Sequence, residues 1–225
     1  MFNKNSIVYL SYSLSNSTPL YGNGTGIKFA PDKEMSKGNS CNTMNLSFPN
    51  HCGTHIDFPY HFNPQGKTIN DFSADFWQFN HVDMVDFSGK VGDCQIINPE
   101  LFHCCENKET DLLIIKTGYG LYRSTDRYTL TPPGLSADLA PFFRKNFPKL
   151  RCIGIDLISI SSYSNREEGR RAHNAFLNSD EGDPILLIED MKLDMKGPFE
   201  RVVVAPLFID NIDGAPCTIF AYTNN

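Results

Sequence analysis

The sequence has little of several features that mark other classes of protein. No run approaches the roughly 20 consecutive apolar residues that a membrane-spanning helix requires. The formal net charge is −6, whereas a general nucleic-acid binder needs a cationic surface to displace counterions from phosphates. We therefore expect the chain to bind neither nucleic acid nor membrane.

The cysteines show no pattern of a disulfide framework or of a thiolate metal site. The chain has seven cysteines, an odd number, at irregular spacings and without a C-x-x-C pair. The start, MFNKNSIVYLSYSLS, has neither a long apolar core nor a small-residue cleavage site, so we expect no signal peptide. A cytoplasmic protein with free thiols fits these features. The adjacent Cys104 and Cys105 are expected to be incidental, because vicinal thiols seldom catalyse without other machinery.

The length of 225 residues permits one sizeable domain or two small ones. No repeat, low-complexity tract or linker divides the chain, so we expect a single α/β domain over residues 1–225. Apolar patterning predicts strands at 6–14, 81–87, 95–102, 111–119, 151–157 and 184–191, and a terminal hairpin at 201–209 and 215–223. Helices are predicted at 136–147, with Ser136 as N-cap, and at 165–178. Residues 15–50, rich in Asn, Ser, Thr, Gly and Pro, predict a long ordered loop or short strands.

The segment NHCGTHIDFPYHF, residues 50–62, concentrates groups that bind metals. It contains three of the six histidines of the chain and a carboxylate: His51, His55, Asp57 and His61. Gly53 and Pro59 disfavour a helix here, as do the β-branched residues between them. The segment is therefore expected to be extended or bent.

An extended chain places these four side chains on one face, because all four positions are odd-numbered and successive side chains alternate between faces. The Cα atoms of His55 and Asp57 would be about 6 to 7 Å apart, near enough to chelate one ion. His51 would lie about 13 Å from His55 in a straight strand, too far for ligand bonds of about 2.1 Å. Gly53 is placed to fold the chain back, because a residue without Cβ adopts the required backbone angles. The alternative is ordinary surface or core histidines; the shared face and the hinge glycine favour a metal site.

The residues from His51 to His61 read H-x-G-T-H-x-D-x-P-x-H and resemble the signature of the cyclase-like metal-dependent hydrolases. That family includes bacterial kynurenine formamidase and isatin hydrolase. Other stretches are similar to the family in the expected order: DLLIIKTGYG, PGLS, IGID, the segment from His173 to Met191, and DGAP at 213–216. The resemblance thus spans nearly the whole chain.

The resemblance implies a swivelling β/β/α fold, with a mixed sheet or flattened barrel and peripheral helices. The implied metal ligands are His51, His55, Asp57, His173 and Glu189. Of these, the first two would bind one metal, Asp57 would bind or bridge, His173 would serve a second position, and Glu189 would bridge or bind. His61 would be the proton donor and acceptor. Without the resemblance, His173 would be interpreted as a helix-surface residue and Glu189 as a strand-end charge.

The chain departs from the family pattern at three places. Asp190 and Met191 replace the Asn-Leu that commonly follows the glutamate, which we expect to matter little. TPLYGN at 18–23 is only partly similar to the family's T-P-x-[WY]-P-G-D stretch; Tyr21 is the candidate substrate-binding aromatic. Cys52 is an unusual neighbour for the ligands. We expect it to pack or to point outward, since adjacent residues of an extended chain face opposite ways; a thiolate ligand is the alternative.

Nitrogen and oxygen ligands favour Zn²⁺, as one or two ions, with Mn²⁺ as a substitute. The expected reaction is hydrolysis of a C–N bond in a small aryl amide, with the metal activating water and polarising the carbonyl. His61 would take the proton and return it to the departing amine. Tyr21, Phe58 and Phe62 would flank a flat aryl group. The alternatives are opening of a cyclic amide such as isatin, or a metal-stabilised binding protein without catalysis. The resemblance also implies a homodimer or homotetramer in which neighbouring chains close the pocket.

Overall fold

The computed structural model describes residues 6–102, 106–178 and 182–223. Cys104 and Cys105 lie outside these ranges, so the expectation for them stays a prediction. Within the described ranges, no helix has the length and apolar character needed to span a membrane.

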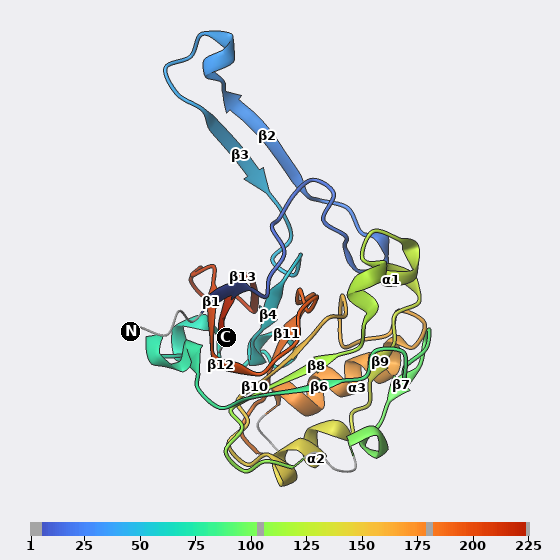
Figure 1. The fold of residues 1–225 in the computed structure, drawn as a ribbon. Helices are drawn as coiled ribbons and strands as arrows, with labels where there is room; N and C mark the ends of the chain where they lie inside the picture. Colours follow the sequence, from blue (N-terminus) through green and yellow to red (C-terminus); the bar gives the residue numbers. More distant parts are fainter. Residues whose placement is uncertain (1–5, 103–105, 179–181, 224–225) are drawn as a thin grey trace.

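A mixed nine-stranded sheet forms the body of the protein (Figure 1). Its main path runs β5-β12-β13-β4-β11-β10-β8-β6, and β1 pairs with β13. The strands are β1 (Ser6–Tyr9), β4 (His55–Asp57), β5 (Gln78–Phe79), β6 (Val82–Asp86), β8 (Leu112–Lys116), β10 (Cys152–Ile155), β11 (Leu186–Glu189), β12 (Phe199–Pro206) and β13 (Gly214–Thr223). Strands β6, β8, β10 and β11 are parallel, whereas β4 pairs antiparallel with both β11 and β13. The predicted α/β fold with a mixed, barrel-like sheet and peripheral helices is confirmed.

The inner parallel strands β8, β10 and β11 are buried on both faces, which explains their continuous apolar runs. Every residue of β10 and β11 is buried, as are the first four of β8. The helices α2 (Leu139–Asn146) and α3 (Arg166–Leu177) cover this part of the sheet (Figure 1). Their contact includes the buried rings of Phe143 and Phe176, with centroids 6.1 Å apart.

Both predicted helices form, but one begins later than expected. Helix α3 starts where the sequence places it, because the Asn165 side chain accepts the backbone N–H of Glu168. Helix α2 begins at Leu139 after Asp138 as N-cap, so the assignment of Ser136 as N-cap is wrong. The Ser136 hydroxyl instead accepts the N–H of Asp138, within the turn that leads into the helix.

Other element boundaries differ where the chain bends. The strand predicted over 95–102 is limited to β7 (Ile96–Ile97), which pairs with β9 (Gly134–Leu135); the 3₁₀ turn Pro99–Phe102 follows. Proline fixes φ and has no N–H for a strand ladder, which favours this early end. The strand predicted at 6–14 ends at Tyr9, and Ser11 then bridges to Met191. The short helix α1 (Asp126–Leu130) is not predicted from the sequence.

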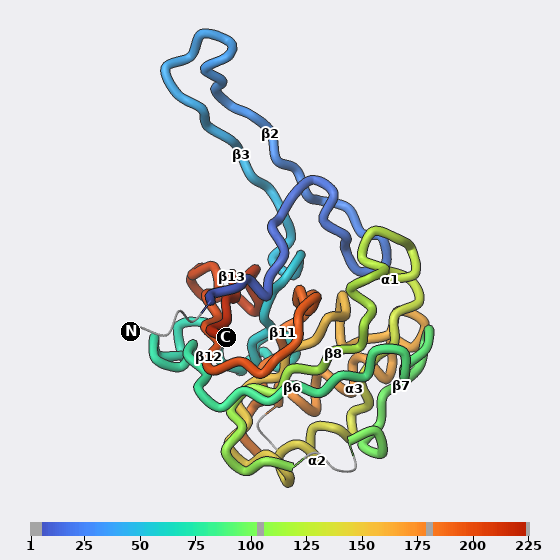
Figure 2. Tube along the Cα trace, in the orientation of Figure 1, coloured from blue at the N-terminus to red at the C-terminus, as the bar shows by residue number. Residues whose placement is uncertain are grey.

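The region 15–50 forms short strands, one of the two expected outcomes. Strands β2 (Lys28–Lys33) and β3 (Thr43–Ser47) make a hairpin that projects from the body (Figures 1 and 2). We call this hairpin, residues 28–47, the arm. Among its exposed apolar side chains are those of Met35, Met44 and Leu46.

Candidate metal centre

The motif segment is bent at the predicted hinge. Gly53 has φ +61°, in the left-handed region that favours glycine, and a Cβ there would lie 2.4 Å from Leu14 Cδ2. After this bend the chain enters β4. His51 is thereby folded back until its Nδ1 is 2.8 Å from Oδ1 of Asp57. The bend thus removes the separation between His51 and His55 that a straight strand would impose, as the sequence predicts.

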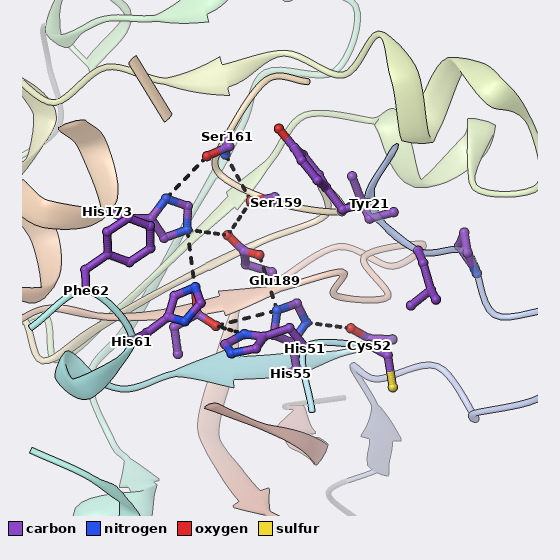
Figure 3. A pocket seen from close by; sticks show the side chains of 15 residues that line it. Tyr21, His51, Cys52, His55, His61, Phe62, Ser159, Ser161, His173 and Glu189 are labelled. Carbon is purple, nitrogen blue, oxygen red and sulfur yellow. Dashed lines mark hydrogen bonds and ion pairs between the residues drawn. The ribbon is translucent and has the colours of Figure 1, made fainter. Parts of the chain in front are cut away.

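Strand β4 brings the distant glutamate to this segment. It lies between β11 and β13, and the β11 register sets Glu189 directly opposite His55. Oε2 of Glu189 is 3.3 Å from Nε2 of His55. Helix α3 contributes His173, whose Nε2 is 3.5 Å from both Oδ2 of Asp57 and Oε1 of Glu189 (Figure 3). Four side chains from three separate elements therefore converge on one buried point.

The outer nitrogen of each buried imidazole is fixed by the backbone. His55 Nδ1 donates to the carbonyl of Gly53 and His173 Nδ1 to the carbonyl of Gly169, both at 2.8 Å. Each Nε2 therefore faces the carboxylates, as in metal sites where a second hydrogen bond sets the ligating nitrogen. Glu189 is held as well, since its Oε1 accepts the N–H of Ile160 at 2.7 Å.

The charges at this point suit a divalent cation. Burial and the neighbouring Asp57 raise the pKa of Glu189, but hydrogen bonds from His173 and His55 outweigh them and lower it to about 2. Burial lowers the pKa of His173, but hydrogen bonds to Asp57 and Glu189 raise it to about 10. Two buried carboxylates are thus balanced by protonated imidazoles in the metal-free protein. A cation that replaces those protons would satisfy the same carboxylates, so the residues fit a metal.

Two overlapping groups of side chains have the spacing of metal ligands. One contains His55, Asp57 and Glu189, the other His51, Asp57 and His61. Within each group the ligand atoms lie within 4.8 Å of one another. Asp57 belongs to both groups, which suits the role that the resemblance implies for it, to bind one metal or to bridge two.

Metal binding near neutral pH should release protons. Burial lowers the pKa of His51, but hydrogen bonds to Asp213 and Asp57 raise it to about 10, and His173 has a similar value. Both imidazoles are therefore protonated at neutral pH and must lose that proton to bind a metal, so affinity should fall as the pH is lowered. Isothermal titration of the metal-free protein with Zn²⁺, in two buffers of different ionisation enthalpy, measures the release. A binding heat independent of the buffer would contradict this charge assignment.

His61 lies beside this centre and has a partner that the sequence does not reveal. It ends the 3₁₀ turn Pro59–His61, and its Nδ1 is 2.8 Å from Oδ2 of Asp213. The same Oδ2 is 3.0 Å from Nε2 of His51, and Asn50 Nδ2 donates to Oδ1 at 2.7 Å. Hydrogen bonds from His51 and His61 hold the pKa of Asp213 well below its usual range. The DGAP stretch is the only signal for Asp213 in the sequence, and it carries no role until the fold sets it against the histidines.

A pocket of about 270 Å³ opens onto these groups. Its apolar lining includes Pro19, Leu20, Tyr21, Phe62 and Ile158. Phe62 stacks on His173, with ring centroids 4.8 Å apart and an interplanar angle of 18°. Tyr21 packs edge-on against Tyr163, with centroids 5.3 Å apart, and its side chain faces the pocket (Figure 3).

Two residues next to the ligands in the sequence, Phe58 and Cys52, direct their side chains away from the metal centre. The expectation that Phe58 flanks the substrate is wrong, because its ring is fully buried against Phe72 and Trp77. Phe58 follows Asp57 on the extended chain and so takes the opposite face. Cys52 borders the pocket, but its sulfur is directed away from the imidazoles (Figure 3). Burial, followed by the charge of Asp190, raises the pKa of this thiol to about 11, which disfavours the thiolate.

Known proteins are similar to this chain in amino-acid sequence. A family model described as putative cyclase matches residues 8–162. The chain belongs to this family. It is 27% identical over 213 residues to a kynurenine formamidase of Geobacillus thermodenitrificans (strain NG80-2) and 26% identical over 218 residues to one of Bacillus anthracis, with 92% of each chain covered.

Solved structures share the fold over almost the whole chain. Isatin hydrolase A from Labrenzia aggregata superposes with a TM-score of 0.81 at 17% identity, covering 98% of this chain and 94% of that one. A potential metal-dependent hydrolase with cyclase activity superposes with a TM-score of 0.76 at 19% identity, covering 98% of both chains. The resemblance to kynurenine formamidase and isatin hydrolase relatives is thereby confirmed.

Proposed function

We propose that this protein is a metal-dependent hydrolase that cleaves the C–N bond of a small aryl amide. The observation that carries the proposal is the convergence of His55, Asp57, His173 and Glu189 at a buried point beneath an apolar pocket. His61 lies at the same pocket without being one of these four groups. Membership of the putative cyclase family and the similarity to kynurenine formamidases support the assignment.

The metal would be held by the five implied ligands: His51, His55, Asp57, His173 and Glu189. Zn²⁺ is the default for imidazole with carboxylate, as one ion or two, and Mn²⁺ is the substitute when carboxylate oxygens are numerous. A bound divalent cation supplies a Lewis acid that polarises the carbonyl and makes water a stronger acid. The remaining steps fall to the side chains of the pocket.

His61 is the group that moves protons. Its Nδ1 is engaged by Asp213, so its Nε2 is the nitrogen available to the reactants. It accepts a proton from the attacking water as the new C–O bond forms, and it gives that proton to the amine nitrogen as the C–N bond breaks. Phe62 and Tyr21 present flat faces that pack against an aryl group and displace bulk water from the reacting carbonyl.

An assay on three amides tests the proposal and separates its substrate classes. Metallated protein is incubated with formanilide, N-formylkynurenine and isatin, and each product is followed by absorbance. We expect hydrolysis of the open-chain formamides, because the kynurenine formamidases are similar over 92% of both chains. Turnover of isatin alone would assign the protein to the cyclic-amide class. Failure to cleave any amide while the metal is bound would contradict the proposed function.

Asp213 should matter as the partner of His61. Asp213→Asn keeps the size of the side chain but removes the charge that both His61 and His51 face. At saturating metal we expect kcat to fall about 10- to 100-fold, as is typical when an outer hydrogen-bond partner is lost. Steady-state kinetics with the metal content measured in parallel checks this. A wild-type kcat in the metal-saturated variant would remove Asp213 from the reaction.

We also propose a homodimer or homotetramer in the cytoplasm. The arm carries exposed apolar residues, and so does the loop from Leu207 to Ile209, which favours burial against another copy. The five cysteines in the described ranges are all free, as suits a reducing compartment. Light scattering after size exclusion should give at least twice the chain mass of 25.3 kDa. A monomer at micromolar concentration would contradict this assembly.

A further inference from the structure

The residue after Glu189 is the centre of a buried polar cluster. Asp190 is 1% exposed at its side chain, and both of its carboxylate oxygens face the Arg123 guanidinium. Arg123 Nε donates to Oδ1 at 2.8 Å and Nη2 to Oδ2 at 2.6 Å, and Tyr128 OH donates to Oδ1 at 2.6 Å. We call these three residues the Asp190 clamp. The guanidinium is itself mostly buried, since the Arg123 side chain is 18% exposed.

The backbone of Asp190 connects the clamp to two strands of the metal centre. Its N–H donates to the carbonyl of Leu157 at 2.6 Å. Its carbonyl accepts the hydroxyl of Thr54 at 2.5 Å, and Thr54 immediately precedes His55. The Thr54 hydroxyl oxygen also accepts the N–H of Tyr12 at 3.0 Å. Asp190 is thus linked to the end of β11 by its peptide bond to Glu189, and to the start of β4 by the hydrogen bond to Thr54, the residue before His55.

The conformation of Asp190 turns the chain sharply at this point. Its φ is +51°, in the left-handed region that Asp and Asn adopt more readily than other non-glycine residues. An asparagine would therefore tolerate the backbone and still offer an oxygen to Tyr128. It would not neutralise Arg123, and an unpaired buried charge is strongly unfavourable. The Asp190 carboxylate therefore has a role that an asparagine could not fill, because it neutralises Arg123. From the sequence alone, the replacement of the family's Asn-Leu pair is expected to matter little.

We propose that the Arg123–Asp190 ion pair positions the metal ligands Glu189 and His55. The inference rests on the proposed function, because it concerns the affinity of the same centre for its metal. Arg123 and Asp190 are positioning residues: neither lines the pocket, and each acts through the backbone that carries a ligand. Loss of the charge would let the turn after Glu189 relax and would loosen the Thr54 hydrogen bond beside His55.

The test is a double-mutant cycle read out as Zn²⁺ affinity, measured by competition with a chromogenic chelator. Asp190→Asn and Arg123→Gln should each weaken Zn²⁺ binding about 10- to 100-fold relative to wild type. The double variant should bind more tightly than the product of the two single losses predicts, because it leaves no unpaired buried charge. Wild-type affinity in both single variants, or additive losses in the double variant, would overturn the proposal.

The neighbouring pair Arg127–Asp93 provides a matched control. It is also an arginine–aspartate contact, at 2.6 Å, but both side chains are well exposed. Asp93→Asn makes the same chemical change without leaving a buried charge, so Zn²⁺ affinity should stay at the wild-type value. Should Asp190→Asn not fold, Thr54→Val removes the hydroxyl that donates to the Asp190 carbonyl and accepts the N–H of Tyr12, and it too should weaken Zn²⁺ binding. Unchanged affinity in Thr54→Val would overturn the proposal.

A second readout needs no metal and separates this inference from the proposed function. Failure of the wild-type protein to bind Zn²⁺ would contradict the proposed function alone. A crystal structure of metal-free Asp190→Asn, or of Thr54→Val, would still report on the clamp. We expect the Glu189 carboxylate to move away from its 3.3 Å contact with His55 Nε2. Retention of that contact, with the turn at residue 190 unchanged, would show that the ion pair does not position the ligands.

Discussion

His61→Ala should lower kcat by about 10²- to 10⁴-fold, the range that general acid–base catalysis contributes, while the metal stays bound. The imidazole of His61 borders the pocket, and its hydrogen-bond partner is Asp213. Four other groups of the centre, His55, Asp57, His173 and Glu189, remain to hold the metal when His61 is removed. Steady-state kinetics combined with elemental analysis of the purified variant separates the two effects.

The control for this variant is His81→Ala. His81 is an exposed histidine just before β6, and its backbone N–H bonds to Asp111. The same substitution there should leave kcat and metal content at wild-type values. A metal-loaded His61→Ala protein with wild-type kcat would refute the role of His61 in proton transfer.

His55→Ala should lose the metal together with the activity. Nε2 of His55 is 3.3 Å from Glu189 and 3.5 Å from Asp57, and the imidazole is buried between them. Removing a ligand should weaken metal binding by more than about 100-fold, the upper range for outer-shell partners. Elemental analysis after dialysis against a chelator measures the loss, and circular dichroism confirms that the variant is folded.

Cys52→Ser is the matched control for the loss of metal. Cys52 lies three residues before His55, but its sulfur is directed away from the imidazoles (Figure 3). Metal content should therefore be unchanged in Cys52→Ser, which also excludes a thiolate ligand. Retention of the full metal content by His55→Ala would remove this imidazole from the ligand set.

The local parts of the site could be predicted from the sequence. Gly53 is flanked by potential ligands in a segment without helix propensity, and the structure has the bend there with φ +61°. Helix α3 is likewise predicted, over 165–178, and it forms at Arg166–Leu177. The burial of His173 is not predicted from the pattern alone, which indicates a helix-surface position for this residue. The bend and the helix are both local features. These features depend on neighbours in the chain, which sequence patterns report well.

The long-range parts could not be predicted in the same way. Glu189 faces His55 only because β4 pairs antiparallel with β11, and no pattern within either strand specifies that partner. Asp213 reaches His61 for a similar reason, since it precedes β13 on the other side of β4. The partner of Asp190 is also remote, because Arg123 is 67 residues away along the chain. Such pairings are fixed by topology, and only the folded chain reveals them.

In the proposed function, hydrolysis depends on a cation held by the five implied ligands, His51, His55, Asp57, His173 and Glu189. The most direct test of this dependence is the hydrolysis of N-formylkynurenine by protein stripped with a chelator and then titrated with Zn²⁺ or Mn²⁺. We expect no turnover by the stripped protein and a recovery of activity that saturates at one or two equivalents of metal. Full activity in stripped protein with no detectable metal would contradict this dependence.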